Sequence, residues 1–314
     1  MLYDGKNEIL YKKNNEIITK YLYNIFMKKI CALVIWYNPD SLSVENILKY
    51  HKFFDKVYII DNSIISNNHL AKQIINSYYF PNYKNLGIAK ALNQGCLKAF
   101  TDNFEWCMTM DQDSTWDTNE LSNYLNNIAS IKDESIKSFA PLHSNEIKSL
   151  IGKIHDKKKI QNCATYKFQH RVMTSGNIIN LNSWNELKGF KEMLFIDEVD
   201  HEYCYNLLEH DYKIIEFQNI SMRHTLGISK KTILPRFCKH SGVRLFYIFR
   251  NMLYIKDIYP ERYNEFIYPK YLIYTIIQKI LEFKIKDLKF IKQGIKAYKN
   301  NIYGSYNDFL EKIK

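Results

Sequence analysis

Two hydrophobic patterns alternate along the first part of the chain. Continuous apolar runs, typical of strands buried on both faces of a sheet, span Ile30 to Trp36, Lys56 to Ile60 and Trp106 to Met110, with a shorter run at Tyr78 to Phe80. Gly87 to Phe100 instead has its apolar residues at helical spacing. Strands that alternate with helices predict βαβ units, and therefore an α/β fold with a mostly parallel central sheet flanked by helices.

The second half of the chain is less regular. Arg171 to Leu181 has the composition of a strand that runs through Ser175-Gly176-Asn177, and Glu198 to Glu209 has helical spacing. Tyr212 to Phe217 and Ile220 to Met222 predict two short strands. From residue 240 onward the pattern predicts helices that are rich in aromatic and basic residues.

These patterns divide the chain into three parts. Residues 1–26 are polar and mixed in character. They are either an additional helix packed on the domain or a segment upstream of a natural start at Met27. Residues 27–239 are expected to form one α/β domain, and residues 240–314 a helical, basic C-terminal region. The chain contains no internal repeat and no low-complexity linker.

Polar side chains follow three of the predicted strands. Tyr37-Asn38, Asp61-Asn62 and Asp111-Gln112-Asp113 each come directly after an apolar run. In parallel sheets, ligands bind in the crevice beyond the carboxyl ends of the strands. We therefore expect these three clusters to lie together at one edge of the sheet and to form a binding site.

Asp111 and Asp113 are candidate metal ligands. Two carboxylates one residue apart supply the hard oxygen ligands that Mg²⁺ or Mn²⁺ prefers, and a metal held there can clamp a diphosphate. The alternative is an acidic loop whose side chains cap the next helix. His224 follows a predicted short strand and is a candidate third ligand, although a single histidine is more often structural.

Asp197-Glu198-Val199-Asp200 opens a predicted helix. Acidic residues are favoured in a first helical turn whatever the function, but three acids are more than a cap requires. One of them can act as a general base toward a hydroxyl group. The run from Asn85 to Ala89 places Gly87 at the start of a helix, where bare N–H groups can approach a phosphate.

Charge and composition restrict the partners and the compartment. The 314 residues carry a formal net charge of +11, which favours anionic partners such as nucleic acid, acidic membranes or phosphorylated substrates. Nucleic acid fits worst, because the chain has no nucleic-acid-binding motif and its acids are concentrated at strand ends. The lack of a signal peptide and of a bilayer-spanning run, together with scattered cysteines, predicts a cytoplasmic protein.

The apolar stretch Leu272 to Phe283 is too short to cross a membrane. Packing in the core is the simpler interpretation of it, and peripheral contact with a membrane surface is the alternative with a functional consequence.

Eight segments, in order, resemble the family-two glycosyltransferases of the GT-A fold, and among them the bacterial rhamnosyltransferase-like branch. The segments are VIWYNPD (Val34 to Asp40), VYIIDNS (Val57 to Ser63), NLGIAKALNQG (Asn85 to Gly95), MDQDS (Met110 to Ser114), TSGNIINL (Thr174 to Leu181), GFKEMLFIDEVDHEYC (Gly189 to Cys204), MRHTLG (Met222 to Gly227) and HSGVRLFYIFRN (His240 to Asn251). The resemblance covers nearly the whole chain after Met27. It implies a GT-A catalytic domain over residues 27–239 and an enzyme that uses a nucleotide-sugar donor.

The resemblance also implies roles for single residues on the donor side. Asp61 would accept a hydrogen bond from the pyrimidine base, and Tyr37 and Asn38 would line the nucleotide pocket. Asn85 and Gly87 would flank the nucleotide sugar. The metal would be held by Asp111, Asp113 and His224, with Asp111 also near the ribose.

On the acceptor side, the catalytic base would be one of Asp197, Glu198 and Asp200. Many relatives carry Glu-Asp here, whereas this chain has Asp197-Glu198, so all three stay candidates and Asp197 ranks first. His240, Arg244, Tyr247 and Arg250 would lie near the diphosphate or the acceptor.

The implied reaction is an inverting, metal-dependent transfer of a hexose. Transfer of L-rhamnose from dTDP-rhamnose matches the branch best, and a UDP-hexose or galactofuranose donor is the alternative. A lipid-linked saccharide of capsule, O-antigen or cell-wall polysaccharide would be the acceptor, at the inner face of the plasma membrane. A catalytically inactive homologue that only binds sugar nucleotides is the alternative from another class.

Overall fold

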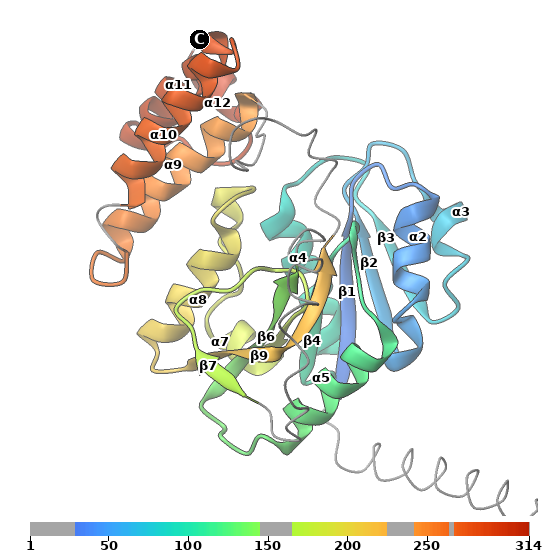
Figure 1. The fold of residues 1–314 in the computed structure, drawn as a ribbon. Coiled ribbons are helices and arrows are strands. Elements are labelled where there is room, and N and C mark those ends of the chain that lie inside the picture. Colours follow the sequence, from blue (N-terminus) through green and yellow to red (C-terminus); the bar gives the residue numbers. More distant parts are fainter. Residues whose placement is uncertain (1–28, 145–164, 225–241, 264–266, 314) are drawn as a thin grey trace, which may run out of the picture.

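The computed structural model describes residues 29–144, 165–224, 242–263 and 267–313 (Figure 1). Its centre is one mixed sheet whose strands run in the order β3-β2-β1-β4-β8-β6-β9-β5, with β7 paired to β9. The strands are β1 (Ile30–Trp36), β2 (Val57–Asp61), β3 (Ser77–Pro81), β4 (Trp106–Asp111), β5 (Ser114–Thr115), β6 (Ile136–Ser144), β7 (Tyr166–Phe168), β8 (Asn177–Asn180) and β9 (Lys213–His224). The first four strands are parallel to one another, and β8 runs antiparallel to β4.

Helices cover both faces of this sheet. They are α2 (Ser41–Leu48), α3 (Asn68–Ala71), α4 (Ile88–Thr101), α5 (Thr118–Ser130), α7 (Leu181–Glu186), α8 (Val199–Glu209), α9 (Gly242–Ile258), α10 (Ile267–Leu281), α11 (Leu288–Lys299) and α12 (Tyr306–Lys312). Short 3-10 turns lie at η1 (His51–Phe53), η2 (Glu192–Leu194) and η3 (Ile285–Asp287).

The period-two alternation of β1 explains the layering. Ala32, Val34 and Trp36 point into the cluster that includes the apolar residues of α2 and α5. Cys31 and Leu33 point to the other face, into the cluster formed with α4, α7 and α8. Because both faces are covered, β1 is apolar throughout, as the continuous run predicted.

The α/β prediction is confirmed, and the four parallel strands lie within one residue of their expected bounds. The strand expected from Arg171 to Leu181 is wrong over its first half. Gly176 has a φ of +78° and donates its N–H to the Thr109 carbonyl over 2.8 Å, so the chain turns there and only β8 remains extended. The two short strands expected after residue 212 form the single strand β9, because β6, β7 and β5 pair with it along its length.

The C-terminal helices α9 to α12 pack together beside α8 (Figure 1). One of their apolar clusters includes Tyr205 of α8, and another contacts Phe195 and Ile196 in the loop before α8. Residues 1–26 and the expected boundary at 239/240 lie outside the described residues, so that division of the chain stays a prediction. Within the described part, no helix has the length and apolar character needed to cross a bilayer.

Candidate active site

The carboxyl ends of β1, β2 and β4 meet at one edge of the sheet. In the strand register, Asp61 lies opposite Trp36, and Asp111 lies opposite Ile35. The polar clusters that follow these strands are therefore neighbours in space, as the parallel-sheet argument requires.

Asp61 is fully buried and its carboxylate is held by the protein. Its Oδ1 accepts the N–H of Ser63 at 2.9 Å, and its Oδ2 accepts from Asn67 Nδ2 at 2.9 Å and from the Tyr79 hydroxyl at 2.7 Å. The orientation of Asp61 is thus set before any nucleotide binds. Its contact with a pyrimidine base stays a prediction.

The side chain of Gln112 ties the Asp111-Gln112-Asp113 turn to the end of β1. Its Oε1 accepts the backbone N–H of Tyr37 at 2.8 Å, and its Nε2 donates to the Tyr37 carbonyl at 3.2 Å. Tyr37 itself keeps about half of its surface exposed (49%). The next residue, Asn38, has a φ of 49° and donates its N–H to Ser63 Oγ at 2.7 Å. The ends of β1, β2 and β4 are therefore cross-linked into one rigid edge.

Asp111 lies among like charges. Its backbone N–H donates to the Oγ atom of Ser175 at 3.1 Å, and Ser175 is fully buried. Burial and then the negative charges of Asp113 and Asp200 raise the pKa of the Asp111 carboxyl to about 7, while Arg244 acts in the opposite direction. Thr174, the residue before Ser175, donates its N–H to Asp200 Oδ2 at 3.2 Å, so residues from three distant parts of the sequence converge here.

His224 is brought to the same place by the sheet. It is the last residue of β9, and its backbone pairs with Ser114, which directly follows Asp113. The side chain of His224 lies outside the described part, and among the side chains described, no three from His, Cys, Asp and Glu form a metal-binding group. The crowded carboxylates of Asp111 and Asp113 nevertheless suit a divalent cation, because they are hard oxygen donors and a cation would relieve their repulsion.

The loop that carries the other candidate acids is strained. Phe195, Asp197 and Glu198 have φ values of 68°, 63° and 61°. Phe195, with ψ at −63°, is the centre of a γ-turn in which the Ile196 N–H donates to the Leu194 carbonyl at 2.8 Å. Such conformations in residues other than glycine cost about 1–3 kcal/mol each, so other contacts have to hold the loop in place.

Helix α9 provides those contacts. The fully buried amide of Asn251 donates to the carbonyls of Leu194, Ile196 and Asp197 at 2.8–3.0 Å. One turn earlier, the Tyr247 ring stacks on Phe195 with centroids 5.2 Å apart.

Arg250, expected at the donor, is instead fully buried beneath the loop. Its Nη2 donates to the Leu194 carbonyl at 2.8 Å, and its Nη1 donates to the Gly304 carbonyl at 2.8 Å. This corrects the prediction that Arg250 contacts the nucleotide, because its donors are already used inside the protein. His240, expected in the same region, lies outside the described residues.

Each of the three candidate acids has a different partner. The Asp197 carboxylate accepts from Arg244, with Nη2 at 2.9 Å and Nε at 3.0 Å from its Oδ1. Burial, only partly offset by this arginine, raises the pKa of Asp197 to about 6. Asp200 accepts the backbone N–H of Thr174 at 3.2 Å.

Glu198 pairs with His201 at 3.0 Å. Burial acts to raise the pKa of Glu198, but the charge and hydrogen bond of His201, together with the charge of Arg171, outweigh it and hold that pKa below its usual value. Burial acts to lower the pKa of His201, but the negative charges of Asp200 and Glu198 and the bond to Glu198 raise it to about 9, so the imidazole is protonated at neutral pH.

Gly87 closes the site on the side of α4. Its φ is +84°, and a Cβ atom there would lie 2.6 Å from the Phe195 carbonyl oxygen. The same oxygen accepts the Ile88 N–H at 2.7 Å, and Asn85 Oδ1 accepts the Gly87 N–H at 3.0 Å. The contact with the strained loop therefore requires glycine at residue 87. The sequence alone had suggested a different reason, the approach of a phosphate to the start of the helix.

Sequence reasoning missed three residues that build the site. Thr174 and Ser175 connect Asp200 and Asp111, and Asn251 holds the acidic loop. A signal was available for each: polar residues interrupt the apolar run before β8, and Asn251 falls on an otherwise apolar face of α9.

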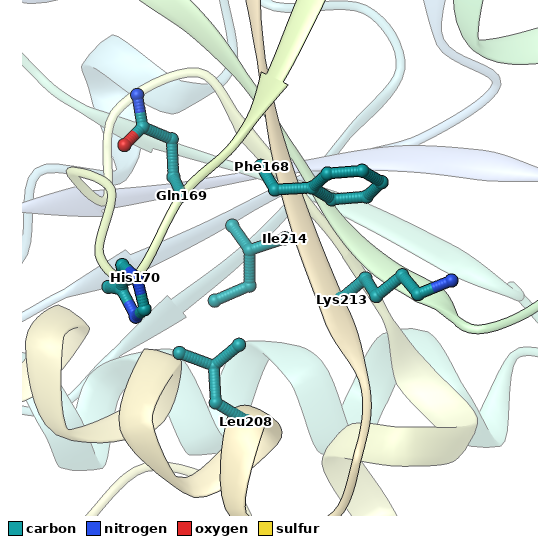
Figure 2. A pocket seen from close by; sticks show the side chains of 6 residues that line it. All are labelled: Phe168, Gln169, His170, Leu208, Lys213 and Ile214. Atoms are coloured by element: carbon teal, nitrogen blue, oxygen red, sulfur yellow. The ribbon is translucent and has the colours of Figure 1, made fainter. Parts of the chain in front are cut away.

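A hollow of about 170 Å³ lies elsewhere, between β7, α8 and the start of β9 (Figure 2). It is lined largely by apolar atoms of Phe168, Leu208 and Ile214, with Lys213 at its rim. Because Ile214 and His224 lie at opposite ends of β9, this hollow is separate from the cluster of acids.

Comparison with known proteins identifies the fold. Residues 42–183 match the family described as Glycosyl transferase family 2. Among curated proteins, none matches this sequence.

The crystal structure of GalNAc-T7 with UDP, GalNAc and Mn²⁺ superposes with a TM-score of 0.55 at 14% identity, over 88% of this chain and 57% of that protein. Residues 1–349 of S. aureus TarS superpose with a TM-score of 0.47 at 13% identity, over 73% of this chain and 65% of that fragment. The chain thus spans little more than half of the length of GalNAc-T7, and the similarity establishes a common fold.

The contribution of the Asn251 hydrogen bonds to the loop can be tested by measuring the stability of a variant. In Asn251→Leu the volume is nearly kept, but the carbonyls of Ile196 and Asp197 lose the Asn251 donor, and the Leu194 carbonyl keeps its bonds from Arg250 and from the Ile196 N–H. We expect the free energy of unfolding, measured by chemical denaturation, to fall by about 2–4 kcal/mol. Asn300→Leu removes an exposed amide that caps α11 at the Lys296 carbonyl, and this control should change stability by less than about 1 kcal/mol. Equal losses in the two variants would contradict the assignment.

Proposed function

Because the chain carries a family-two glycosyltransferase domain with the GT-A fold, we propose that it transfers a sugar from a nucleoside diphosphate donor to a hydroxyl group of a saccharide. One observation carries the proposal: the end of β4 and the acidic helix α8 meet at the edge of the sheet where such ligands bind, since Ser175 accepts the Asp111 N–H and the adjacent Thr174 donates to Asp200.

The donor diphosphate would lie beside Asp111, Asp113 and His224. These residues would hold Mg²⁺ or Mn²⁺, which when bound neutralises the negative charge that develops on the leaving diphosphate. GalNAc-T7, whose fold this chain shares, was crystallised with UDP and Mn²⁺. The raised pKa of Asp111 supports a cation here, because burial and the negative charges of Asp113 and Asp200 disfavour its ionised form, and a bound cation would oppose both effects.

The nucleoside would occupy the rigid edge formed by β1 and β2. Exposed Tyr37 offers an aromatic face for stacking, and exposed Asn38 offers polar atoms beside it. Asp61 would accept from the base once the nucleoside reaches its buried carboxylate, which Asn67 and Tyr79 hold in place. The donor sugar would face exposed Asn85, next to Gly87, whose contact with Phe195 holds this segment against the acidic loop.

Asp197 is the strongest candidate for the base. The acceptor hydroxyl oxygen would attack the anomeric carbon while its proton passes to the Asp197 carboxylate, and the bond from that carbon to the diphosphate oxygen would break with its electron pair leaving on the nucleotide. A single displacement of this kind inverts the anomeric centre. A pKa of about 6 leaves Asp197 ionised at neutral pH and yet a better proton acceptor than an ordinary carboxylate. The lowered pKa makes Glu198 a weaker base, and Asp200 is engaged by Thr174.

For the donor we propose dTDP-rhamnose, on the resemblance of the DQDS and FIDEVD segments to the rhamnosyltransferase-like branch; a UDP-hexose or galactofuranose donor is the alternative. A lipid-linked saccharide of capsule, O-antigen or cell-wall polysaccharide would be the acceptor, at the inner face of the plasma membrane. An inactive sugar-nucleotide-binding homologue is less well supported, because every expected acidic position is occupied.

The reaction class and the metal are tested together by donor turnover. We expect purified protein with Mg²⁺ or Mn²⁺ to release nucleoside diphosphate from one member of a panel of dTDP-, UDP- and GDP-sugars, and Asp113→Asn to lose about a hundredfold or more of that rate. Asp117→Asn is the matched control, because it removes a nearby acid while asparagine still caps α5. Release from dTDP-rhamnose would support the donor; release from another sugar alone would keep the class and discard rhamnose. Calorimetry that detects no binding of any donor would overturn the proposal.

The identity of the base is tested by three substitutions. Asp197→Asn should lower turnover by about 10²–10⁴-fold, because an amide cannot accept the proton of the acceptor hydroxyl as a carboxylate can. Glu198→Gln and Asp200→Asn should each retain more activity than Asp197→Asn in the same assay. If Glu198→Gln or Asp200→Asn is the slowest of the three, the base has been misassigned.

The pH dependence tests the partnership of Asp197 with Arg244. A base has to be deprotonated, so in saturating metal the rate should fall as the pH drops through about 6. Arg244→Gln removes the charge that stabilises the ionised carboxylate, which raises the pKa of Asp197 and should move the acidic limb of the profile to higher pH. Arg262→Gln, which breaks an exposed ion pair with Glu209, should leave the limb in place; an unchanged limb in Arg244→Gln as well would argue against Asp197.

A further inference from the structure

Helix α10 is oriented with its polar residues inward. Its two most buried side chains are Thr275 and Lys279, which are 3% and 1% exposed. Four large apolar side chains in the second half of the helix face outward instead, and about half or more of the surface of each is exposed: Ile273, Ile277, Ile280 and Leu281. These four recur at spacings of four, three and one, so they form one continuous stripe along the helix.

Contacts on the inner side fix this orientation. Lys279 Nζ lies 3.6 Å from Asp287 Oδ2 and 3.7 Å from Glu282 Oε2. The rings of Tyr268 and Tyr271 pack against Phe249 of α9, with centroids 5.8 and 5.7 Å apart. Rotating the helix to bury its isoleucines would break the ion pairs and remove the tyrosines from α9. The apolar stripe is therefore held outward by the fold.

The apolar surface continues beyond the helix. Phe283 is 93% exposed and Ile285 is 58% exposed in the turn that follows α10. A contiguous exposed apolar surface of this kind usually marks an interaction site, because it is otherwise a cost in solubility.

The charge around this surface is positive. The exposed lysines between α10 and the end of α11 are Lys270, Lys284, Lys286, Lys289, Lys292, Lys296 and Lys299. The acids of the same stretch, Glu282 and Asp287, pair with the buried Lys279, and Glu282 also lies 3.7 Å from Lys284. Lys270, three residues before Ile273 on α10, and Lys286, next to Ile285 in the turn, therefore place positive charge beside the apolar side chains.

We propose that this face of α10 and the turn after it lie in the interface of an anionic lipid bilayer. The apolar stripe would enter the boundary between headgroups and acyl chains, and the lysines would contact the anionic headgroups. Charge complementarity favours a bilayer over a second protein, whose contact surface would be expected to be depleted in lysine. The proposal stands on α10 alone; if the proposed transferase function also holds, it brings the site close to a lipid-linked acceptor, since α10 packs on α9 and α9 holds the acidic loop.

Vesicle binding tests the proposal with the full chain. We expect the protein to co-float with phosphatidylcholine vesicles that contain phosphatidylglycerol, and to bind vesicles of phosphatidylcholine alone much more weakly. Ile277→Glu/Ile280→Glu should lower the partition coefficient by about tenfold or more. Lys286→Gln/Lys289→Gln should lower it by about fivefold for each lysine, and added salt should have the same direction of effect.

The matched control is Ile75→Glu/Leu97→Glu, which makes the same kind of change at exposed apolar residues away from α10. It should bind vesicles like the unmodified protein. All variants should unfold at the same temperature, because the substituted side chains are exposed.

Undiminished binding in Ile277→Glu/Ile280→Glu, or no binding of the unmodified protein to anionic vesicles, would overturn the proposal. A dimer that the same substitutions dissociate would show that the face binds a second copy instead. Donor turnover in solution should be unchanged in these variants, so a failure here is distinguishable from a failure of the transferase proposal.

Discussion

The buried amide of Asn251 is the contact on which the geometry of the acidic loop depends. Three carbonyls, from Leu194, Ile196 and Asp197, receive their hydrogen bonds from this one side chain. Together with Arg250 on the Leu194 carbonyl and Tyr247 stacked on Phe195, these bonds offset the cost of the positive φ angles in the loop. The position of the loop in turn dictates glycine at residue 87, where a side chain would collide with Phe195.

This contact also makes the C-terminal helices part of the site. Helix α9 brings Asn251, Tyr247 and Arg250 to the underside of the loop and Arg244 to the carboxylate of Asp197. The segment that the resemblance treated as an extension beyond the catalytic domain thus supplies the residues that position the candidate base. A helix that holds one catalytic element on one side and α10 on another also connects the chemistry of the site to the exposed apolar face.

The electrostatics of the site follow from crowding. Asp111, Asp113 and Asp200 come from segments that only the tertiary fold brings together, and burial followed by the negative charges of Asp113 and Asp200 destabilises the ionised state of Asp111. Asp197 is buried next to its arginine, so its pKa is raised but stays below neutrality. Similar carboxylates therefore have different proton affinities in one site, a separation that suits the proposed roles of metal ligand and base.

The sequence by itself determined the parallel half of the sheet and the edge at which the acids gather. Those predictions rest on local rules: a strand covered on both faces has to be apolar throughout, and parallel strands present their carboxyl ends on one side. The tertiary structure alone decided that Arg250 supports the loop from within, that Asn251 and Ser175 are needed, and that α10 turns its isoleucines outward. Each of these depends on a partner far away in the chain, such as Leu194 for Arg250 or Asp111 for Ser175, and hydrophobic periodicity carries no information about distant pairing. In α10 the buried ion pairs of Lys279 override the pattern, because a buried charge has to keep its partners, whereas an exposed isoleucine costs little.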